Sequence, residues 1–325
     1  GAFLIQEAAM GDKLTLFSEM IVFSQYAMQV VMSFMMLVMI FILLPRASVA
    51  AKRINEVLDT EPAIEDGDGN IREQGSGEIE FRNVSFRYPD AEHPVLEDIT
   101  FTAHKGETVA FIGATGCGKS TVINLIPRFY DATEGEVLVD GVNVKEYRQK
   151  QLRDKIGYVS QKATLFSGTI ASNVAFGDNG REEFTGEDVK DAVRTAQAEE
   201  FVSRLEGTYD GYVAQGGGNL SGGQRQRISI ARAICRKPEI LIFDDSFSAL
   251  DYKTDRILRG ALDKECKDVT RLIVAQRIGT IRDADKIIVL EDGKIAGMGT
   301  HEELMEQCEV YRQIAYSQLS KEELA

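Results

Sequence analysis

Two adjacent aspartates, Asp244 and Asp245, are the residues of this chain best placed to do chemistry. They follow the apolar residues Ile240 to Phe243, and an apolar run that ends in an acid is typical of a buried strand. Such a strand delivers a carboxylate, which is a preferred magnesium ligand, to the edge of a sheet. The next residue, Asp245, is then placed to orient a water molecule near a phosphate. The pair predicts a site for a nucleotide and its magnesium ion.

A glycine-rich segment supplies the matching phosphate site. Gly113 to Thr121 reads GATGCGKST, fits the pattern GxxxxGK[ST], and follows a short apolar strand over 108–112. Its glycines let backbone N–H groups approach phosphates, and the helix that follows adds its positive end. We expect Lys119 to contact the β- and γ-phosphates and Ser120 to bind magnesium. The residues assigned to nucleotide binding in this loop are Gly113, Ala114, Thr115, Gly116, Cys117, Gly118, Lys119, Ser120 and Thr121.

A second segment with phosphate-binding character is Leu220 to Gln224, which reads LSGGQ. Ser221 can cap a helix over 222–235, and Gly222 and Gly223 leave its first turn without side chains. A bare helix start attracts phosphate but contributes no catalytic group of its own. Taken alone, the segment could be an ordinary capped helix.

In their order along the chain, these segments resemble the ATP-binding cassette (ABC) family. The resemblance covers nearly the whole chain, and the matching positions are Tyr88, Gly113 to Thr121, Gln161, Leu220 to Gln224, Asp244, Asp251 and Gln276. It implies ATP and Mg²⁺ as ligands and a dimer in which each LSGGQ segment faces the γ-phosphate held by the partner's loop. Ser221, Gly222, Gly223 and Gln224 would therefore contact ATP held by a second chain.

The resemblance also gives roles to two residues that mean little alone. Tyr88 matches the family's aromatic residue that stacks on adenine. Gln161, at the end of an expected strand over 157–161, matches the glutamine that ligates magnesium together with Ser120 and Asp244. Without the resemblance, a tyrosine at a strand end is more often structural, and most strand-end glutamines are simply solvated.

Two positions depart from the family pattern, and both concern hydrolysis. The family usually has glutamate where this chain has Asp245 and histidine where it has Gln276. Because aspartate is one methylene shorter than glutamate, its carboxylate lies roughly 1.5 Å farther from the nucleotide. A misplacement of about 1 Å can cost about 10²-fold in rate. Glutamine donates a hydrogen bond but cannot carry the charge or shuttle the proton of an imidazole. We expect a catalytic group of Asp244, Asp245 and Gln276 that turns over slowly, unless Asp245 acts through an intervening water.

The LSGGQ segment, in contrast, is complete. This chain should therefore complete a competent site on a different chain, whereas two copies of it would make two slow sites. The sequence thus resembles the degenerate-site subunit of heterodimeric bacterial multidrug exporters, with a second ABC half-transporter as its partner.

The segment from Met20 to Leu44 contains no charged residue. About 25 residues at roughly 1.5 Å each span about 37 Å, enough to cross a bilayer core with some tilt. The segment is too long for a signal peptide, and acidic residues precede it. A buried core helix is the other alternative. Arg46, Lys52 and Arg53 follow directly, so the positive-inside rule places this flank in the cytoplasm.

These features predict four regions. Residues 1–61 would be the end of a transmembrane domain, with one membrane helix over about 15–45 and a cytoplasmic extension, in contact with membrane lipid. Residues 62–78 would be a linker, 79–318 an α/β nucleotide-binding domain, and 319–325 a tail. In the domain we expect a mostly parallel sheet, an antiparallel edge near 79–102 and a helical subdomain near 149–235. The chain does not begin with methionine, so we expect it to be part of a longer multi-pass protein of the cell membrane.

Net charge and cysteine spacing argue against two further classes of partner or site. The 325 residues carry a formal net charge of −14 and no Lys/Arg-rich run, which argues against a nucleic-acid partner. The four cysteines are scattered without metal-ligand spacing, so we expect neither a zinc site nor a disulfide framework.

We therefore expect an ATP-driven exporter of small amphipathic compounds. Three alternatives stay open at this point: an ATP-gated channel or regulatory subunit, a lipid exporter and a peptide exporter. A soluble mechano-ATPase that acts on DNA or ribosomes is opposed by the uncharged membrane segment.

Within that segment Gln25, Gln29 and Ser33 lie three or four residues apart, on one helical face. A polar stripe in lipid should face other helices or a water-filled path. Cysteines placed singly at these positions should therefore react with water-soluble thiol reagents in the assembled transporter. Labelling by lipid-soluble probes alone would contradict this assignment.

Overall fold

The computed structural model describes residues 2–7, 9–69, 76–89, 91–179 and 184–318. The chain divides into two compact units, Gly1–Ala63 and Ile64–Ala325, and each is described by itself. The expected tail over 319–325 and the middle of the expected linker, 70–75, lie outside the described residues.

The first unit is helical. A short helix, α1 (Ala2–Glu7), precedes α2 (Lys13–Leu58), whose 46 residues include Pro45 in its interior. The most apolar stretch of α2 has a mean hydropathy of 2.5, so the helix is long and apolar enough to cross a membrane. The expected membrane segment and its expected extension form one continuous helix. On its polar face, Ser33 Oγ donates to the backbone oxygen of Gln29 at 2.8 Å.

The second unit is built on a six-stranded sheet with the strand order β12-β11-β3-β10-β9-β6. Neighbouring strands from β11 to β6 pair in parallel, and β12 pairs antiparallel with β11 at the edge. The prediction of a mostly parallel sheet is confirmed. The strands are β3 (Thr108–Gly113), β6 (Ile156–Val159), β9 (Ile240–Asp244), β10 (Thr270–Val274), β11 (Lys286–Glu291) and β12 (Lys294–Gly299).

This sheet separates two hydrophobic cores, and β9 shows how. Its residues Ile240 to Phe243 are all fully buried, as expected for a strand covered on both faces. Because side chains alternate along a strand, Ile240 and Ile242 enter one core while Leu241 and Phe243 enter the other. The apolar residues of β9 are therefore buried on both faces of the sheet, and Asp244 lies at the end of the strand.

A four-stranded antiparallel sheet, in the order β2-β1-β4-β5, covers one of these cores. Helix α3 (Lys119–Leu125) contributes to the same core and packs against β3. Asn83 forms an irregularity in β1, because it has a left-handed backbone (φ 48°) and the pairing shifts between Phe81 and Val84. The strands are β1 (Ile79–Phe86), β2 (Leu96–Ala103), β4 (Glu134–Val139) and β5 (Val142–Asn143).

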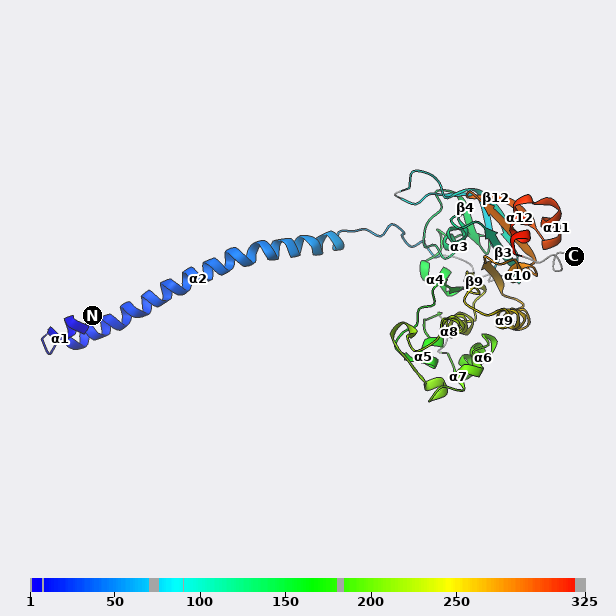
Figure 1. Cartoon of the computed structure of the whole chain (residues 1–325). Helices are drawn as coiled ribbons and strands as arrows, with labels where there is room; N and C mark the ends of the chain where they lie inside the picture. Colours follow the sequence, from blue (N-terminus) through cyan, green and yellow to red (C-terminus); the bar gives the residue numbers. More distant parts are fainter. Residues whose placement is uncertain (1, 8, 70–75, 90, 180–183, 319–325) are drawn as a thin grey trace. The chain divides into compact units, whose positions relative to one another are not determined.

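Helices gather on the other core. In Figure 1, α5 and α6 lie around α8, the helix over Gly222–Cys235 that the sequence predicts. The expected helical stretch over 149–235 also contains β6, which belongs to the central sheet. The remaining helices and small strands are α4 (Gln149–Asp154), β7 (Gly168–Thr169), α5 (Ile170–Val174), α6 (Gly186–Thr195), α7 (Glu199–Val202), η1 (Thr208–Asp210), β8 (Tyr212–Val213), η2 (Gln215–Gly217), α9 (Tyr252–Glu265), α10 (Ile278–Ile281), α11 (His301–Gln307) and α12 (Glu309–Gln318).

One buried carboxylate anchors the entry into this unit. Asp140, in the turn between β4 and β5, accepts hydrogen bonds on Oδ1 from the backbone N–H groups of residues 76, 77 and 78 at 2.7–3.1 Å. Its other oxygen pairs with Lys155 Nζ at 2.9 Å, and Lys155 also reaches Glu239 at 2.8 Å. Only 4% of the Asp140 side chain is exposed. The end of the expected linker is therefore fixed to the domain.

We expect Asp140→Asn to lower stability at pH 7 by about 2–3 kcal/mol, because hydrogen bonds to a charged group are worth about 1.5–3 kcal/mol. For a domain of this size that is a fall in Tm of roughly 4–12 °C. Asparagine tolerates the left-handed backbone of this residue (φ 54°), so the change removes the charge and one acceptor oxygen without straining the backbone.

The loss should depend on pH. Although burial acts to raise it, the pKa of Asp140 is held below its usual value by Lys155 and Ser76. Its stabilisation is complete above the unfolded pKa of about 4 and is lost as the pH falls through the lowered folded value. The Tm difference from wild type should therefore shrink in acid. Asp268→Asn, at an exposed aspartate, is the control, and equal Tm values at pH 7 would contradict the anchor.

Candidate functional site

The carboxyl ends of β6, β9, β10 and β3 meet at one edge of the central sheet, because these neighbours run parallel. A cavity of about 350 Å³ lies there, which we call the strand-end cavity. It is lined by Tyr88, Val95, Thr115, Gly116, Gly118, Lys119, Ser120, Thr121, Gln161, Asp244, Asp245, Val274 and Gln276. Residues far apart in sequence are thus brought together as in other open parallel sheets, where ligands bind at this edge.

The glycine-rich loop joins β3 to α3 and needs glycine at defined points. A Cβ on Gly113 would lie 2.1 Å from the backbone oxygen of Leu290, so no side chain fits there. Gly118 caps α3 in a left-handed conformation (φ 100°), and a Cβ there would meet Leu96 at 2.6 Å. Cys117 is buried within the loop. The predicted strand–loop–helix context of this motif is present.

Lys119 is held over the loop. Its Nζ donates to the backbone oxygens of Gly113 at 2.9 Å and Ala114 at 2.7 Å, and it lies 3.6 Å from Cys117 Sγ. The ammonium group therefore sits beside the loop's backbone and inside the strand-end cavity, where a phosphate group would need a countercharge.

Asp244 provides the candidate metal carboxylate. Its Oδ1 accepts a hydrogen bond from Ser120 Oγ at 2.8 Å, and Gln161 lines the same cavity. Among the described residues, no three His, Cys, Asp or Glu side chains gather as a metal cluster. A magnesium ion needs no such cluster, since it commonly takes one or two carboxylates together with substrate phosphates. The hydroxyl, carboxylate and amide oxygens present here fit that requirement.

Asp245 lies in a different environment from its neighbour. It is 7% exposed and has a left-handed backbone (φ 46°), and its Oδ2 accepts hydrogen bonds from two side-chain amides. Gln276 Nε2 donates at 2.8 Å and Gln161 Nε2 at 3.2 Å. Burial raises the pKa of Asp245 above its usual value and the charge of Asp244 adds to this, while the amide of Gln161 opposes it. The two positions that depart from the family pattern are thus in direct contact.

Tyr88 lines the cavity from the antiparallel sheet. Its hydroxyl lies 3.2 Å from Thr121 Oγ1, and its ring packs edge-on against Phe86 and Tyr130 at centroid distances of 4.8 and 5.1 Å. The ring is partly exposed, so one aromatic surface is available at the rim.

Ser221 to Gln224 do not line the strand-end cavity. They open α8 with a capping box, which includes the expected cap by Ser221: Ser221 Oγ accepts from Gln224 N at 3.3 Å, and Gln224 Oε1 accepts from Ser221 N at 2.8 Å. Ser221 and Gly222 are exposed. The structure therefore leaves this helix start open to a partner from outside the chain.

Three residues near the cavity were not predicted from the sequence. Val95 and Val274 supply apolar walls, and no local pattern marks them as site residues. Tyr158 donates from the neighbouring strand toward Asp244, with its hydroxyl 3.3 Å from Oδ2. Burial raises the pKa of Tyr158 far above its usual value, so the phenol is neutral and can act as a donor.

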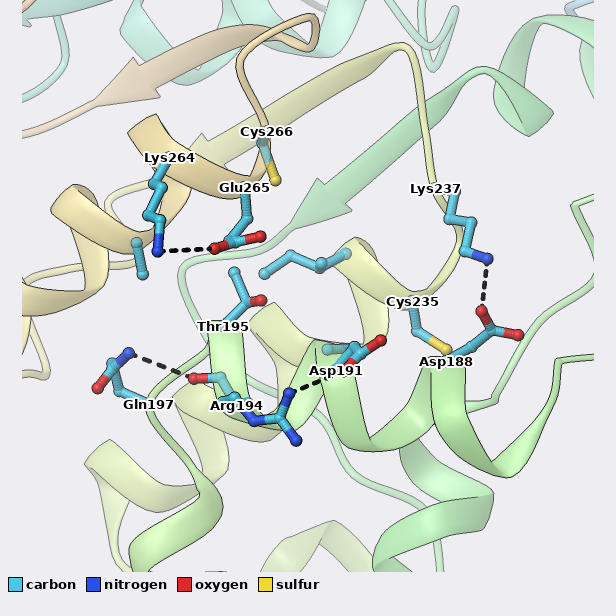
Figure 2. Close-up of a pocket in the computed structure, with 13 residues that line it drawn as sticks. Asp188, Asp191, Arg194, Thr195, Gln197, Cys235, Lys237, Lys264, Glu265 and Cys266 are labelled. Carbon is cyan, nitrogen blue, oxygen red and sulfur yellow. Dashed lines mark hydrogen bonds and ion pairs between the residues drawn. The ribbon is translucent and has the colours of Figure 1, made fainter.

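A larger cavity, of about 480 Å³, lies between α6 and the ends of α8 and α9 (Figure 2). It contains no glycine-rich loop, and its charged lining residues pair with one another: Lys237 with Asp188, Arg194 with Asp191, and Lys264 with Glu265. It also holds two buried thiols, and burial raises the pKa of both, that of Cys235 to about 11. The strand-end cavity is the better candidate for a phosphate ligand.

Comparisons with known proteins agree with this geometry. Residues 96–248 match the model of the ABC transporter family. An uncharacterised ABC transporter ATP-binding protein of Mycobacterium tuberculosis is 45% identical over 304 residues, which are 92% of this chain and 51% of that protein. The ATP-dependent lipid A-core flippase of Yersinia pestis is 42% identical over 269 residues, or 83% of this chain and 46% of that protein.

Among solved structures, a bacterial Atm1-family ABC exporter with ATP bound is similar, with a TM-score of 0.79 and 32% identity over 85% of this chain and 48% of that one. The chain spans about half the length of the curated relatives it matches. Fold, motif order and relatives lead to one conclusion: this chain carries the nucleotide-binding domain of an ABC transporter, and exporters are among its relatives.

Proposed function

We propose that this chain is the ATP-binding subunit of an ABC exporter and that it binds MgATP in the strand-end cavity. The observation that carries this proposal is the set of groups gathered there: a glycine-rich loop, Lys119, and the paired oxygens of Ser120 and Asp244. An apolar helix precedes the nucleotide-binding domain in the same chain, which is the arrangement of exporters. Such a protein would lie in the cell membrane with this domain in the cytoplasm.

Each group has a part in binding. The backbone N–H groups of the glycine-rich loop would surround the phosphates, and Lys119 would exchange its two backbone oxygens for phosphate oxygens. Ser120, Gln161 and Asp244 would hold Mg²⁺, which neutralises phosphate charge when bound. The exposed ring surface of Tyr88 would stack on the adenine.

We therefore expect Lys119→Ala to weaken ATP binding tenfold or more, because it removes the cation at the phosphates. Calorimetry on the purified chain, with and without Mg²⁺, measures this. Lys105→Ala is a matched control, since Lys105 is an exposed lysine 3.9 Å from Asp268 and does not line the cavity. Equal ATP affinity in wild type and Lys119→Ala would exclude this site.

We also propose that hydrolysis at this site is slow. A base that orients water needs a carboxylate oxygen within reach of that water. Asp245 is short, and its Oδ2 is engaged by two amides that donate hydrogen bonds but cannot accept a proton. The site is thus better suited to hold a nucleotide than to turn it over.

The start of α8 supports a partner role. Its residues Ser221 to Gln224 are complete and lie outside this chain's own cavity, so they would serve the nucleotide of a second half-transporter. A heterodimer in which the partner carries the better catalytic residues follows from this division.

In such a heterodimer, Asp245→Asn should lower steady-state ATPase activity modestly, by less than about threefold, because Asp245 contributes little turnover. Ser221→Arg should nearly abolish activity, because a bulky cation would block the helix start that faces the partner's γ-phosphate. Both can be measured in one assay on the purified heterodimer. If Asp245→Asn is as damaging as Ser221→Arg, the site is catalytically competent and the degenerate-site assignment is wrong.

The substrate class we propose is amphipathic. The lipid A-core flippase among the relatives favours lipids as the second candidate within that class. Membrane lipid would then be both surroundings and substrate. An ATP-gated channel is the alternative that a slow site permits, and ion flux measured against vectorial substrate transport in vesicles distinguishes the two.

A further inference from the structure

The hydroxyl of Tyr158 lies between two polar groups beside the strand-end cavity. It is 3.3 Å from Asp244 Oδ2 and 3.0 Å from Asn124 Oδ1. Tyr158 reaches this place from β6, which pairs in parallel with β9 and sets Tyr158 opposite Ile242. The contact therefore depends on the register of two strands whose residues are more than eighty positions apart.

Together these contacts tie both oxygens of Asp244 to one helix. Ser120 and Asn124 lie one turn apart on α3, so they share a face. Ser120 Oγ donates directly to Oδ1 at 2.8 Å, and Asn124 reaches Oδ2 through Tyr158. A phenol has one hydrogen, which the charged carboxylate attracts more strongly than a neutral amide does. A half-turn of the Asn124 carboxamide then presents its NH₂ group to the phenol oxygen.

The position of the Tyr158 ring does not depend on its hydroxyl. The ring packs edge-on against Phe129 at a centroid distance of 5.6 Å and lines an apolar groove that also contains Phe166 and Phe176. Arg153 stacks over Phe129 on the same groove, at 5.4 Å from its centroid. Removal of the hydroxyl alone should therefore leave the ring in place and delete one donor to Asp244.

We propose that Tyr158 is a positioning residue that orients Asp244 for Mg²⁺. This inference rests on the proposed function, because it requires that the cavity hold MgATP. Groups that hydrogen-bond to a metal ligand fix its orientation, and their loss commonly reduces metal affinity 10- to 100-fold. Tyr158 would thus set how much Mg²⁺ this site needs while making no contact with the nucleotide itself.

The test is Tyr158→Phe in the full chain, purified in detergent. ATP affinity is measured by calorimetry in EDTA and then across a Mg²⁺ titration. In EDTA we expect Tyr158→Phe to bind ATP within about twofold of wild type, since the phosphate-binding loop is untouched. The Mg²⁺ concentration that gives half of the affinity gain should rise about tenfold.

Tyr147→Phe is the matched control. Tyr147 is also buried, and its hydroxyl donates to the backbone oxygen of Val139 at 3.0 Å, away from the cavity. It should lose comparable stability, measured as Tm, and keep the wild-type Mg²⁺ requirement. Asn124→Ala removes the carboxamide that hydrogen-bonds to the Tyr158 hydroxyl. Like Tyr158→Phe, it should raise the Mg²⁺ requirement.

The outcomes separate this inference from the proposed function. If wild type binds no ATP, both fail. If wild type gains affinity from Mg²⁺ and Tyr158→Phe gains it at the same concentration, Tyr158 does not position Asp244, whereas the ATP site remains. If Tyr158→Phe and Tyr147→Phe raise the Mg²⁺ requirement equally, the cause is a general loss of folding. That result would also overturn the positioning role.

Discussion

The parallel pairing of β9 with β10 is the constraint on which the site depends. In this register Asp244 lies opposite Val274, so the residues that follow, Asp245 and Gln276, leave neighbouring strands at the same level. The N–H of Asp245 also donates to the backbone oxygen of Val274 at 3.0 Å, which fixes the turn after β9. A shift by one residue would reverse the faces of the strand and move Asp244 away from Ser120. The fully buried apolar residues of β9 hold this register, so core packing and site geometry cannot be varied separately.

Two adjacent carboxylates at one strand end would repel each other, and the chain gives them different neighbours. Asp244 receives hydroxyl groups, from Ser120 and Tyr158, while Asp245 receives side-chain amides, from Gln161 and Gln276. A hydroxyl group can donate to a carboxylate and still offer its oxygen to a metal, whereas an amide NH₂ only donates. The environment of Asp244 therefore suits a metal ligand, and that of Asp245 suits a carboxylate held in place. This difference gives a physical basis for the slow hydrolysis that we propose at this site.

Much of this arrangement could be predicted from the sequence because its signals are local. The turn at Asp292-Gly293 and the irregularity at Asn83 each follow from a few neighbouring residues, and all three residues have left-handed backbones. Contacts that depend on strand register could not be predicted, and Tyr158 is the main example. The anchoring of the linker by Asp140 was missed for the same reason. The continuity of α2 through Pro45 does not follow from the sequence either, since proline removes a helical hydrogen bond and favours a break, while good helix formers surround it.

The capping box of α8 bears on the proposed division of labour between two chains. Ser221 Oγ acts there as an acceptor, for the N–H of Gln224, so the box does not use its hydroxyl hydrogen. The side chain of Gln224 is held in turn by the N–H of Ser221, which keeps both groups in one orientation. A phosphate that approaches this helix start meets a pre-oriented hydroxyl donor and bare glycine N–H groups, and it needs no rearrangement of the cap. In the proposed heterodimer, the helix start that would serve the partner's nucleotide is therefore already ordered in the single chain.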